Sequence, residues 1–512
     1  MQGLDDRSVI VIGAGFGGLS TAVYLADAGA RVTVVEKNEQ LGGRATVLEA
    51  DGFRFDVGPS WYLMPDVFER FFDHFDRSPS AFYDLEHLDP HYRIFFKENV
   101  GPRPDGDPPG LRTATDGDRV DITADLSKTI ELFDAFEDGA GEALESYLER
   151  SRTNYEIGMK HFVYDDRSRL RDFLDPSLVR HARGLTLLGT MQDHVESYFD
   201  HSKLQQILQY TLVFLGGSPH NTPALYNLMS HVDFNLGVFY PEGGMGGVVD
   251  AFVELGRDLG VEFVTDDIVR EIRGGRGAFT VEADSGYYHA DLIVSDADYA
   301  HTEQELLAPS DRQYGTNYWE SRTYAPSAFM LYLGVEGAVP ELAHHTLVLP
   351  ESWDEHFAQI FDDPRWPTDP AYYVSVPSET DETVAPDGHS TVVILVPIAP
   401  GLDDGHEQRA AYRDTILADL ASETETDLRD RIVFEESIAV SEYRDWYNSW
   451  QGTALGLAHT LKQTALFRPP HRSSALDGLY YTGSYTTPGI GVPMTIVSGE
   501  HTAKYLLEDE TG

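Results

Sequence analysis

The order of apolar and polar positions at the start of the chain predicts a strand, a helix and a second strand. Residues 9–12 are an unbroken apolar run, which is typical of a strand buried on both faces of a parallel sheet. A glycine-rich turn follows, and residues 19–28 then continue with one charged side chain, which indicates a largely buried helix. Residues 31–35 are rich in valine and predict the next strand. Together these segments predict a β-α-β unit of a parallel sheet.

Comparable patterns return far along the chain. A glycine run at residues 243–247 opens a predicted helix that ends near residue 259. A short apolar strand at 479–482 precedes a predicted helix over 494–507. Further strands are predicted at 261–265, 268–272 and 290–297. We therefore predict an α/β nucleotide-binding domain that is discontinuous in sequence and consists of residues 1–80, 241–305 and 470–512.

The remaining chain predicts a second domain, which makes the protein α+β overall. Its strands, expected at 329–335, 374–376 and 391–397, would form an antiparallel sheet, and helices between residues 126 and 215 would cap that sheet. An acidic amphipathic helix at 403–422 is interpreted as a solvated face. The second domain would then have a helical part over 81–240 and a sheet part over 306–469.

Two apolar segments stand out. Residues 204–232 contain no Asp, Glu, Lys or Arg, although 24% of the chain is charged. Gly216, Gly217 and Pro219 interrupt this stretch, so it does not predict a transmembrane helix. It predicts either a buried helix and loop, or the wall of an apolar tunnel or a membrane-dipping edge. The same alternatives apply to a second apolar face behind Pro65, formed by Val67, Phe68, Phe71, Phe72 and Phe75.

Composition excludes several classes of protein. The 512 residues, 41% of them hydrophobic, are enough for two or three packed domains. The absence of cysteine excludes disulfides, thiolate metal sites, Fe–S clusters and cysteine nucleophiles, and no metal site is expected. The net charge of -47 opposes nucleic-acid binding, because the phosphate backbone is repelled. Acidic residues are spread along the whole chain, which suits solubility in concentrated salt, so we expect a halophilic source.

The chain shows no sign of export or of membrane insertion. Its first residues lack the basic segment of a secretory signal, and no run of about 20 apolar residues is present. We expect a cytoplasmic protein that lies peripherally at the inner face of the cell membrane.

Glycine spacing after the first strand predicts a dinucleotide site. Gly13 allows the tight turn, Gly15 lets the backbone approach a pyrophosphate, and Gly18 lets the helix pack closely on the strand. The helix N-terminus directs partial positive charge at that pyrophosphate. Glu36 ends the second strand, 18 residues after Gly18, where a carboxylate accepts hydrogen bonds from ribose hydroxyls.

The segment Leu41-Gly42-Gly43-Arg44 favours FAD over NAD. It resembles the second glycine motif of the superfamily of FAD-dependent amine oxidases and carotenoid desaturases. Its glycines allow a close backbone pass, and Arg44 can offset phosphate charge. Near the other end of the chain, residues 478–499 are free of charge and rich in glycine, which fits a backbone that passes close to a flat ring.

The resemblance extends over most of the chain. Residues 51–60, 240–246 and 325–334, the Phe467-Arg468-Pro469 segment and the 488–493 tail are similar to motifs of bacterial and archaeal phytoene desaturases. This family implies a Rossmann-type FAD-binding domain of the two-part glutathione reductase kind, beside a substrate domain. It also implies FAD as the redox cofactor and a hydrophobic polyene drawn from a membrane as the substrate. The chain departs from the pattern of the family in an inserted surface loop at 101–110, and this loop does not weaken the resemblance.

The motifs and the resemblance together place one set of residues at the flavin. These are Gly13, Gly15, Phe16, Gly17, Gly18, Glu36, Lys37, Gly42, Gly43, Arg44, Gly58, Pro59, Ser60, Val269, Gly483, Gly489, Gly491, Val492, Pro493 and Met494.

The reaction implied by the resemblance is desaturation of a C40 polyene, with phytoene to lycopene as the first expectation. A carotenoid 3,4-desaturase of a bacterioruberin-type pathway is a close alternative. A flavin-dependent carotenoid isomerase, an amine oxidase and a non-catalytic carotenoid-binding flavoprotein remain open. The final electron acceptor, oxygen or a quinone, is not determined by the sequence.

The sequence does not identify a catalytic base. Glu242, His220, His231 and His459 lie near the motifs, and each is interpreted as structural. An allylic cation stabilised by the polyene can lose its proton to water or to the flavin.

Overall fold

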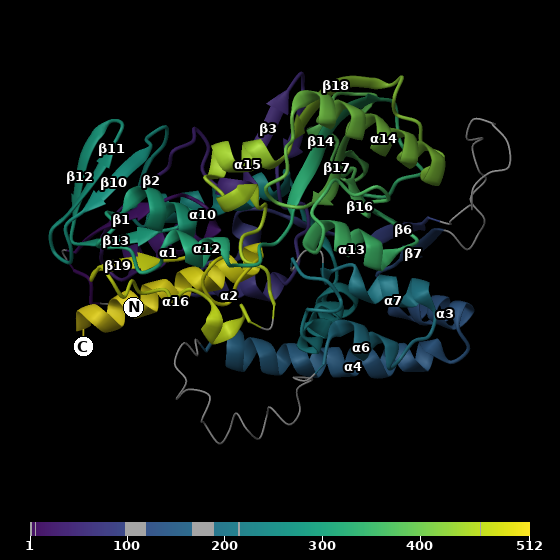
Figure 1. Ribbon diagram of the computed structural model, residues 1–512, viewed down its shortest axis with the longest axis horizontal. Coiled ribbons are helices and arrows are strands. Elements are labelled where there is room, and N and C mark those ends of the chain that lie inside the picture. The colour runs from purple at the N-terminus through teal and green to yellow at the C-terminus, as the bar shows by residue number, and fades with distance from the viewer. Residues whose placement is uncertain are drawn as a thin grey trace.

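The computed structural model describes residues 3–5, 7–97, 119–165, 189–212, 216–460 and 462–511. The loop predicted at 101–110 lies outside these residues. Figure 1 shows a nucleotide-binding half on the left, around β1, β13 and α16, and a second half on the right, around β14 and β17.

A five-stranded parallel sheet forms the core of the first half, in the order β19-β13-β1-β2-β9. Its strands are β1 (Ser8–Ile12), β2 (Arg31–Val35), β9 (Glu262–Val264), β13 (Leu292–Ser295) and β19 (Leu479–Tyr481). The prediction of these strands is confirmed, and the sheet unites segments that lie hundreds of residues apart.

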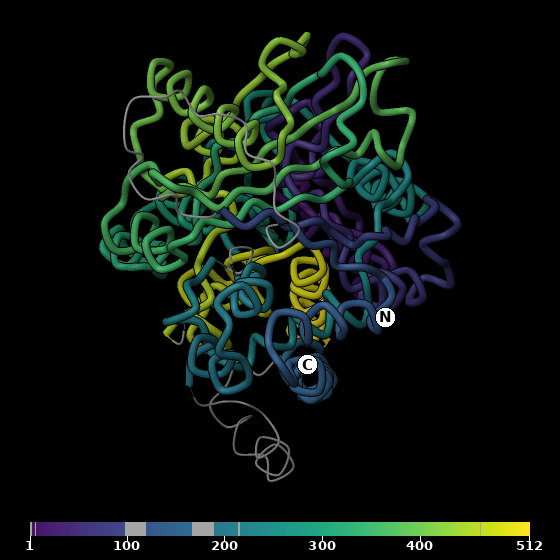
Figure 2. The backbone as a smooth tube through the Cα atoms, turned by 90° about the vertical axis from the view of Figure 1, so that its right-hand side faces the viewer, coloured from purple at the N-terminus to yellow at the C-terminus, as the bar shows by residue number. Residues whose placement is uncertain are grey.

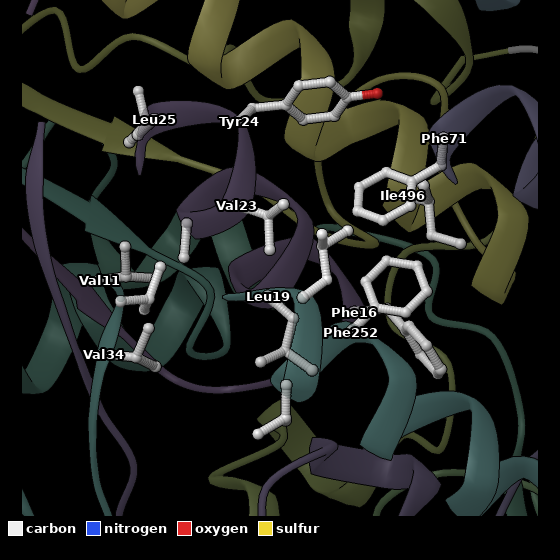
Figure 3. Packing of buried hydrophobic residues seen from close by; sticks show 14 of the residues in the cluster. Val11, Phe16, Leu19, Val23, Tyr24, Leu25, Val34, Phe71, Phe252 and Ile496 are labelled. Carbon is white, nitrogen blue, oxygen red and sulfur yellow. The ribbon is translucent and has the colours of Figure 1, made fainter. Parts of the chain in front are cut away.

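Three helices pack beside this sheet. They are α1 (Phe16–Asp27), α10 (Gly244–Asp258) and α16 (Val492–Thr511). Figure 3 shows Leu19 and Val23 of α1 between the strand residues Val11 and Val34 on one side and Ile496 of α16 on the other. Burial on several sides explains the low charge of α1, because a charged side chain there would lose its hydration.

A separate antiparallel sheet consists of β10 (Val269–Arg273), β11 (Phe279–Ala283) and β12 (Gly286–Ala290). The strand predicted at 268–272 is therefore present as β10, but it does not join the parallel sheet. The smaller elements outside the two large sheets are the hairpin of β3 (Val47–Ala50) and β4 (Phe53–Asp56), α2 (Pro65–Asp73), the pair β5 (Leu85–His87) and β8 (Phe239–Pro241), α11 (Tyr299–His301), α12 (Thr316–Glu320) and α15 (Val440–Tyr447).

The second half is built on a seven-stranded sheet in the order β18-β14-β17-β16-β15-β6-β7. The strands predicted at 329–335, 374–376 and 391–397 are neighbours with antiparallel pairing, as expected. The sheet as a whole is mixed, because β15 and β6 pair in parallel while every other neighbouring pair is antiparallel. The strands are β6 (Tyr92–Phe96), β7 (Arg119–Ile122), β14 (Ser327–Glu336), β15 (His345–Leu349), β16 (Tyr372–Ser375), β17 (His389–Ile398) and β18 (Ile432–Ile438).

Helices cover the large sheet. The predicted acidic helix is α14 (His406–Thr424), and α13 (Trp353–Phe361) lies nearby. Tyr412, Ile416 and Leu420 of α14 are buried in the core of the sheet, so only the opposite face of this helix is solvated.

A helical layer packs below the sheet (Figures 1 and 2). It consists of α3 (Leu126–Phe136), α4 (Ala140–Gly158), α6 (Met191–Glu196), α7 (Ser202–Gln209) and α9 (Leu228–His231). Among the helices of the described ranges, none is long and apolar enough to cross a membrane. The division of the chain into domains stays a prediction.

Candidate functional site

A cavity of about 680 Å³ lies at the carboxyl ends of strands β1, β2, β13 and β19. Its volume is within the range of small-molecule sites, ~300–1,000 Å³. The carboxyl edge of a parallel sheet is where open α/β folds bind their ligands. The cavity continues from this edge toward the seven-stranded sheet and the helical layer, so the two halves of the protein share it.

Eighteen of the twenty residues predicted at the flavin line this cavity. They come from the loop after β1, the end of β2, the 42–44 and 58–60 turns, β10, and the segments 483–485 and 490–495. Gly18 and Gly489 lie behind its wall. A side-chain carbon at Gly18 would be 2.3 Å from the carbonyl oxygen of Gly13, and one at Gly489 would be 2.3 Å from the ring of His459. Glycine at position 18 therefore lets α1 pack closely against the backbone at Gly13, and glycine at position 489 leaves room for the ring of His459.

The glycines of the loop place no side chain of their own between the backbone and the cavity. Gly13 adopts a φ of +96°, which favours glycine, and turns the chain from β1 into α1. A side-chain carbon at Gly17 would lie 2.9 Å from the backbone of Gly483. The glycine loop and the segment at Gly483 thus approach one another too closely for a side chain to fit between them. The backbone N–H groups of the loop lie at the N-terminus of α1, where a phosphate can bind.

Glu36 is buried beside this loop. Its carboxylate accepts hydrogen bonds from the backbone N–H groups of Ala14, at 2.8 Å, and Asn38, at 2.9 Å. Burial raises its pKa, while the same N–H groups oppose the rise. The neighbouring Lys37 donates to the carbonyl of Asp445 and to Asn448, at 2.5 and 3.2 Å, and so holds the C-terminal end of α15 at the cavity rim.

Arg44 provides a cationic donor beside the glycine loop, because Gly42 donates to the carbonyl of Ala14 at 2.8 Å. Its Nη2 donates to Ser449 at 2.6 Å, and its guanidinium lies 5.7 Å from the ring of Tyr447. Its Nε is buried and has no acceptor in the described chain. A buried donor of this kind fits an anionic oxygen of a ligand, such as a phosphate. The glycine loop, the carboxylate of Glu36 and this guanidinium therefore fit FAD.

Asp296 is a site residue that the sequence reasoning missed. It follows β13 at the carboxyl edge, and side-chain carbons at Gly15 and Gly17 would lie 2.6 and 2.5 Å from its carboxylate oxygens. Desolvation, together with the negative charge of Glu36, raises its pKa to about 7, although backbone N–H groups of Gly18 and Gly15 oppose the rise. An acidic residue at the end of the strand predicted at 290–297 was the sequence feature that could have identified Asp296 as a site residue.

This raised pKa predicts that FAD affinity falls as pH rises. The anionic pyrophosphate disfavours the ionised form of Asp296, so FAD binds best when the carboxyl is protonated, below pH 7. Above pH 7 we expect the Kd for FAD to increase by up to about tenfold per pH unit. Fluorescence titration of FAD from pH 6 to 9 measures this.

Asp296→Asn should flatten the pH profile. Asp291→Asn is the matched control, because Asp291 lies at the other end of β13, accepts from Ser8 and has a lowered pKa. A wild-type affinity that is constant from pH 6 to 9 would contradict the prediction.

The second part of the cavity is an apolar arm. Its wall comes from the end of α4, the 224–231 segment, the chain before α2 and the start of α16: Leu63, Met64, Met159, Phe162, Val163, Leu225, Leu228, Met229 and Met494. Among the described residues of this wall, none is a carboxylate or a lysine. The arm therefore suits a hydrocarbon.

The two alternatives for the charge-free stretch 204–232 both hold, each for a different part. Leu204, Ile207 and Leu208 of α7 are buried in the core of the helical layer, whereas Leu225 and Leu228 line the arm. Leu215 lies outside the described residues. The apolar face of α2 does not line the cavity, because Val67, Phe68, Phe71 and Phe72 are buried in the cores and Phe75 packs against one of them. The tunnel interpretation is wrong for α2.

Of the four residues interpreted as structural, only His459 lies at the cavity. His220 forms an exposed ion pair with Asp354 at 2.8 Å, and His231 hydrogen-bonds to Asn235 at 2.7 Å. Glu242 is not among the lining residues. Within the residues that the structure describes, no group of three or more His, Asp or Glu side chains could hold a metal ion.

Comparison with known proteins agrees with this site. The family model described as flavin containing amine oxidoreductase matches residues 16–507. A carotenoid 3,4-desaturase of Haloarcula japonica is 60% identical over 511 residues, which cover 99% of this chain and 100% of the relative. A phytoene desaturase of Fusarium fujikuroi is 30% identical, over 98% of this chain and 90% of its own.

Solved structures share the fold. An oxidoreductase from Methanosarcina mazei has a TM-score of 0.62 at 17% identity and covers 97% of this chain and 100% of its own. Putrescine oxidase bound to putrescine has a TM-score of 0.59 at 16% identity, with 99% of each chain covered.

The chain belongs to the flavin-containing amine oxidoreductases. More particularly, it is a member of the carotenoid desaturases, an FAD-dependent oxidoreductase that acts on CH–CH groups. The predictions of the family, the fold class and the cofactor are confirmed.

Proposed function

We propose that the protein is a carotenoid 3,4-desaturase. The observation that carries this proposal is the 60% identity, over the full length of both chains, with the Haloarcula japonica enzyme of that name. The conversion of phytoene to lycopene, which the sequence favoured first, has weaker support, because the phytoene desaturases are about 30% identical. The apolar arm agrees with a polyene substrate, and the described residues of its wall include no carboxylate that could pair with an amine.

The residues predicted at the flavin are proposed to bind different parts of FAD. The 13–17 loop receives the pyrophosphate, Glu36 receives ribose hydroxyls, and Arg44 offsets phosphate charge. The 58–60 turn and the 491–494 segment border the ring, beside the apolar arm. When bound, FAD supplies the hydride acceptor.

The protein's own contribution is to orient the polyene and to exclude water. Met64, Phe162 and Leu228 give the arm an apolar wall, which displaces water around the reacting carbons. His459 is neutral, because burial keeps its pKa well below the usual value. Both its ring nitrogens are engaged in hydrogen bonds, so we assign it a positioning role.

Anaerobic flavin bleaching tests the assignment. The protein is purified with FAD in multimolar salt and mixed with carotenoids in liposomes, and the flavin and pigment spectra are followed together. Bleaching with a late carotenoid, with a red-shifted product, is expected for a 3,4-desaturase. Bleaching with phytoene would restore the first expectation, and no bleaching with any carotenoid would favour an isomerase, an amine oxidase or a binding protein.

We propose that the protein contacts the membrane through the segment around Phe467. Thr464 and Ala465 line the cavity, and Phe467, two residues further on, is 58% exposed. A large exposed apolar side chain beside the cavity is suited to insertion into lipid. Because the protein is acidic, we expect it to bind uncharged lipid better than anionic lipid.

Vesicle flotation measures this contact. Phe467→Ser is expected to reduce binding to phosphatidylcholine vesicles at least threefold, because it removes apolar area from the contact. Tyr287→Ser is the matched control, since Tyr287 is 62% exposed on β12, in the separate three-stranded sheet. Equal losses in both variants would place the contact elsewhere.

A further inference from the structure

A chain of hydrogen bonds ends at the cavity wall near the apolar arm. The backbone N–H of Ile490 donates to Nε2 of His459 at 3.1 Å. Nδ1 of His459 lies 2.6 Å from the hydroxyl of Tyr226, and that hydroxyl lies 3.2 Å from Oγ1 of Thr464. His459, Tyr226 and Thr464 all line the cavity.

The direction of the first two bonds is fixed. A backbone N–H can only donate, so Nε2 of His459 carries a lone pair. A neutral imidazole with a lone pair on Nε2 has its proton on Nδ1, which therefore donates to the hydroxyl oxygen of Tyr226. Gly489 supports this arrangement, because a side-chain carbon there would lie 2.4 Å from Nε2 and displace the ring.

One proton is left over at the end of the chain. The oxygen of Tyr226 already accepts from His459, so the Tyr226–Thr464 pair has two hydroxyl protons and a single contact between them. Whichever hydroxyl donates across that contact, the other proton has no acceptor in the described part of the protein. A pure hydrocarbon offers it none, and an unpaired donor against an apolar ligand costs binding free energy.

We propose that the Tyr226–Thr464 pair is a subsite for an oxygen atom, hydroxyl or keto, near the end of the polyene. The spare proton donates to that oxygen and so fixes how far the polyene enters the arm. Both residues then determine specificity without touching the bond that is oxidised. The inference rests on the proposed function in one respect, namely that the substrate is a carotenoid.

The test compares two carotenoids of equal polyene length, with and without an end-group hydroxyl, by the rate of anaerobic flavin bleaching. Wild-type protein is expected to favour the hydroxylated pigment at least tenfold in kcat/KM, mainly through KM. Equal rates with both pigments would overturn this inference and leave the proposed function intact. No bleaching with either pigment would count against the proposed function itself.

The variants follow from the proton count. Thr464→Val leaves the Tyr226 proton free, and Tyr226→Phe leaves the Thr464 proton free, so each single change keeps a donor and part of the preference. The double variant Y226F/T464V removes both hydroxyls, so its kcat/KM with the hydroxylated pigment should fall towards that with the hydrocarbon; the Nδ1–H of His459, which then has no acceptor, keeps at most a small part of the preference. Thr415→Val is the control, because that hydroxyl bonds only to Ala411 within α14.

FAD itself is the competing acceptor for the spare proton. The affinity of the double variant for FAD, measured by fluorescence titration without carotenoid, is expected to equal that of wild type. A weakened FAD affinity, or a preference that is undiminished in the double variant, would overturn the proposal.

Discussion

Gly18→Ala is expected to weaken FAD binding at least 100-fold. The added carbon would lie 2.3 Å from the carbonyl oxygen of Gly13, and backbone cannot move aside cheaply where β1 turns into α1. The loop must therefore open, and the N–H groups that receive the pyrophosphate lose their arrangement. FAD fluorescence titration measures the loss. Since Gly18 does not line the cavity, the effect reports the shape of the loop rather than a lost contact.

Two further variants make this result interpretable. Gly315→Ala is the matched control, because its φ is -83° and an added carbon meets nothing within 4 Å. Gly15→Ala would meet a carboxylate oxygen of Asp296, at 2.6 Å, and its added carbon would also stand where the backbone approaches the pyrophosphate. We therefore expect a loss of similar size there, through obstruction of the ligand rather than through the shape of the loop. Near-wild-type affinity in Gly18→Ala would show that the loop is not the phosphate site.

Arg468→Lys is expected to destabilise the fold by about 3 kcal/mol or more. The buried guanidinium donates to five backbone carbonyls, those of Leu457, Gln463, Ser484, Tyr485 and Thr486. Lysine has three donors around a single nitrogen and cannot reach all five. At least two buried carbonyls would lose their partners. Urea unfolding in concentrated salt gives the free energy.

Arg431→Lys provides the comparison for this variant. Arg431 also donates to backbone carbonyls, those of Glu336 and Ala338, but these bonds are exposed. We expect a change within about 0.5 kcal/mol there. If Arg468→Lys unfolds at the same urea concentration as wild type, the carbonyls have found other donors and the prediction is wrong.

Local pattern was enough to predict the parallel sheet and the glycine loop. The runs at 9–12 and 31–35 became β1 and β2 because an apolar segment next to a tight turn has few alternatives to burial. The helix predicted from residue 494 begins at Val492, a difference of the size expected at helix ends.

Long-range contacts set the limit of prediction. The apolar face of α2 has the same helical spacing whether it meets a core or a cavity, and no local signal separates the two cases. Asp296 and Glu36 approach the same loop from strands 260 residues apart, and Tyr226 meets Thr464 across 238 residues. Such pairs depend on how the two halves pack together, which spacing along the chain does not report.

The position of β19 and α16 has a consequence for biosynthesis. β19 pairs with β13, and α16 packs on α1, where Gly499 lies close to the carbonyl of Gly17. A nascent chain that has emerged only to residue 470 therefore lacks one wall of the nucleotide site. Flavin insertion is therefore expected only after β19 and α16 have emerged from the ribosome, so FAD acts on chains in which both ends of the nucleotide-binding half are already present.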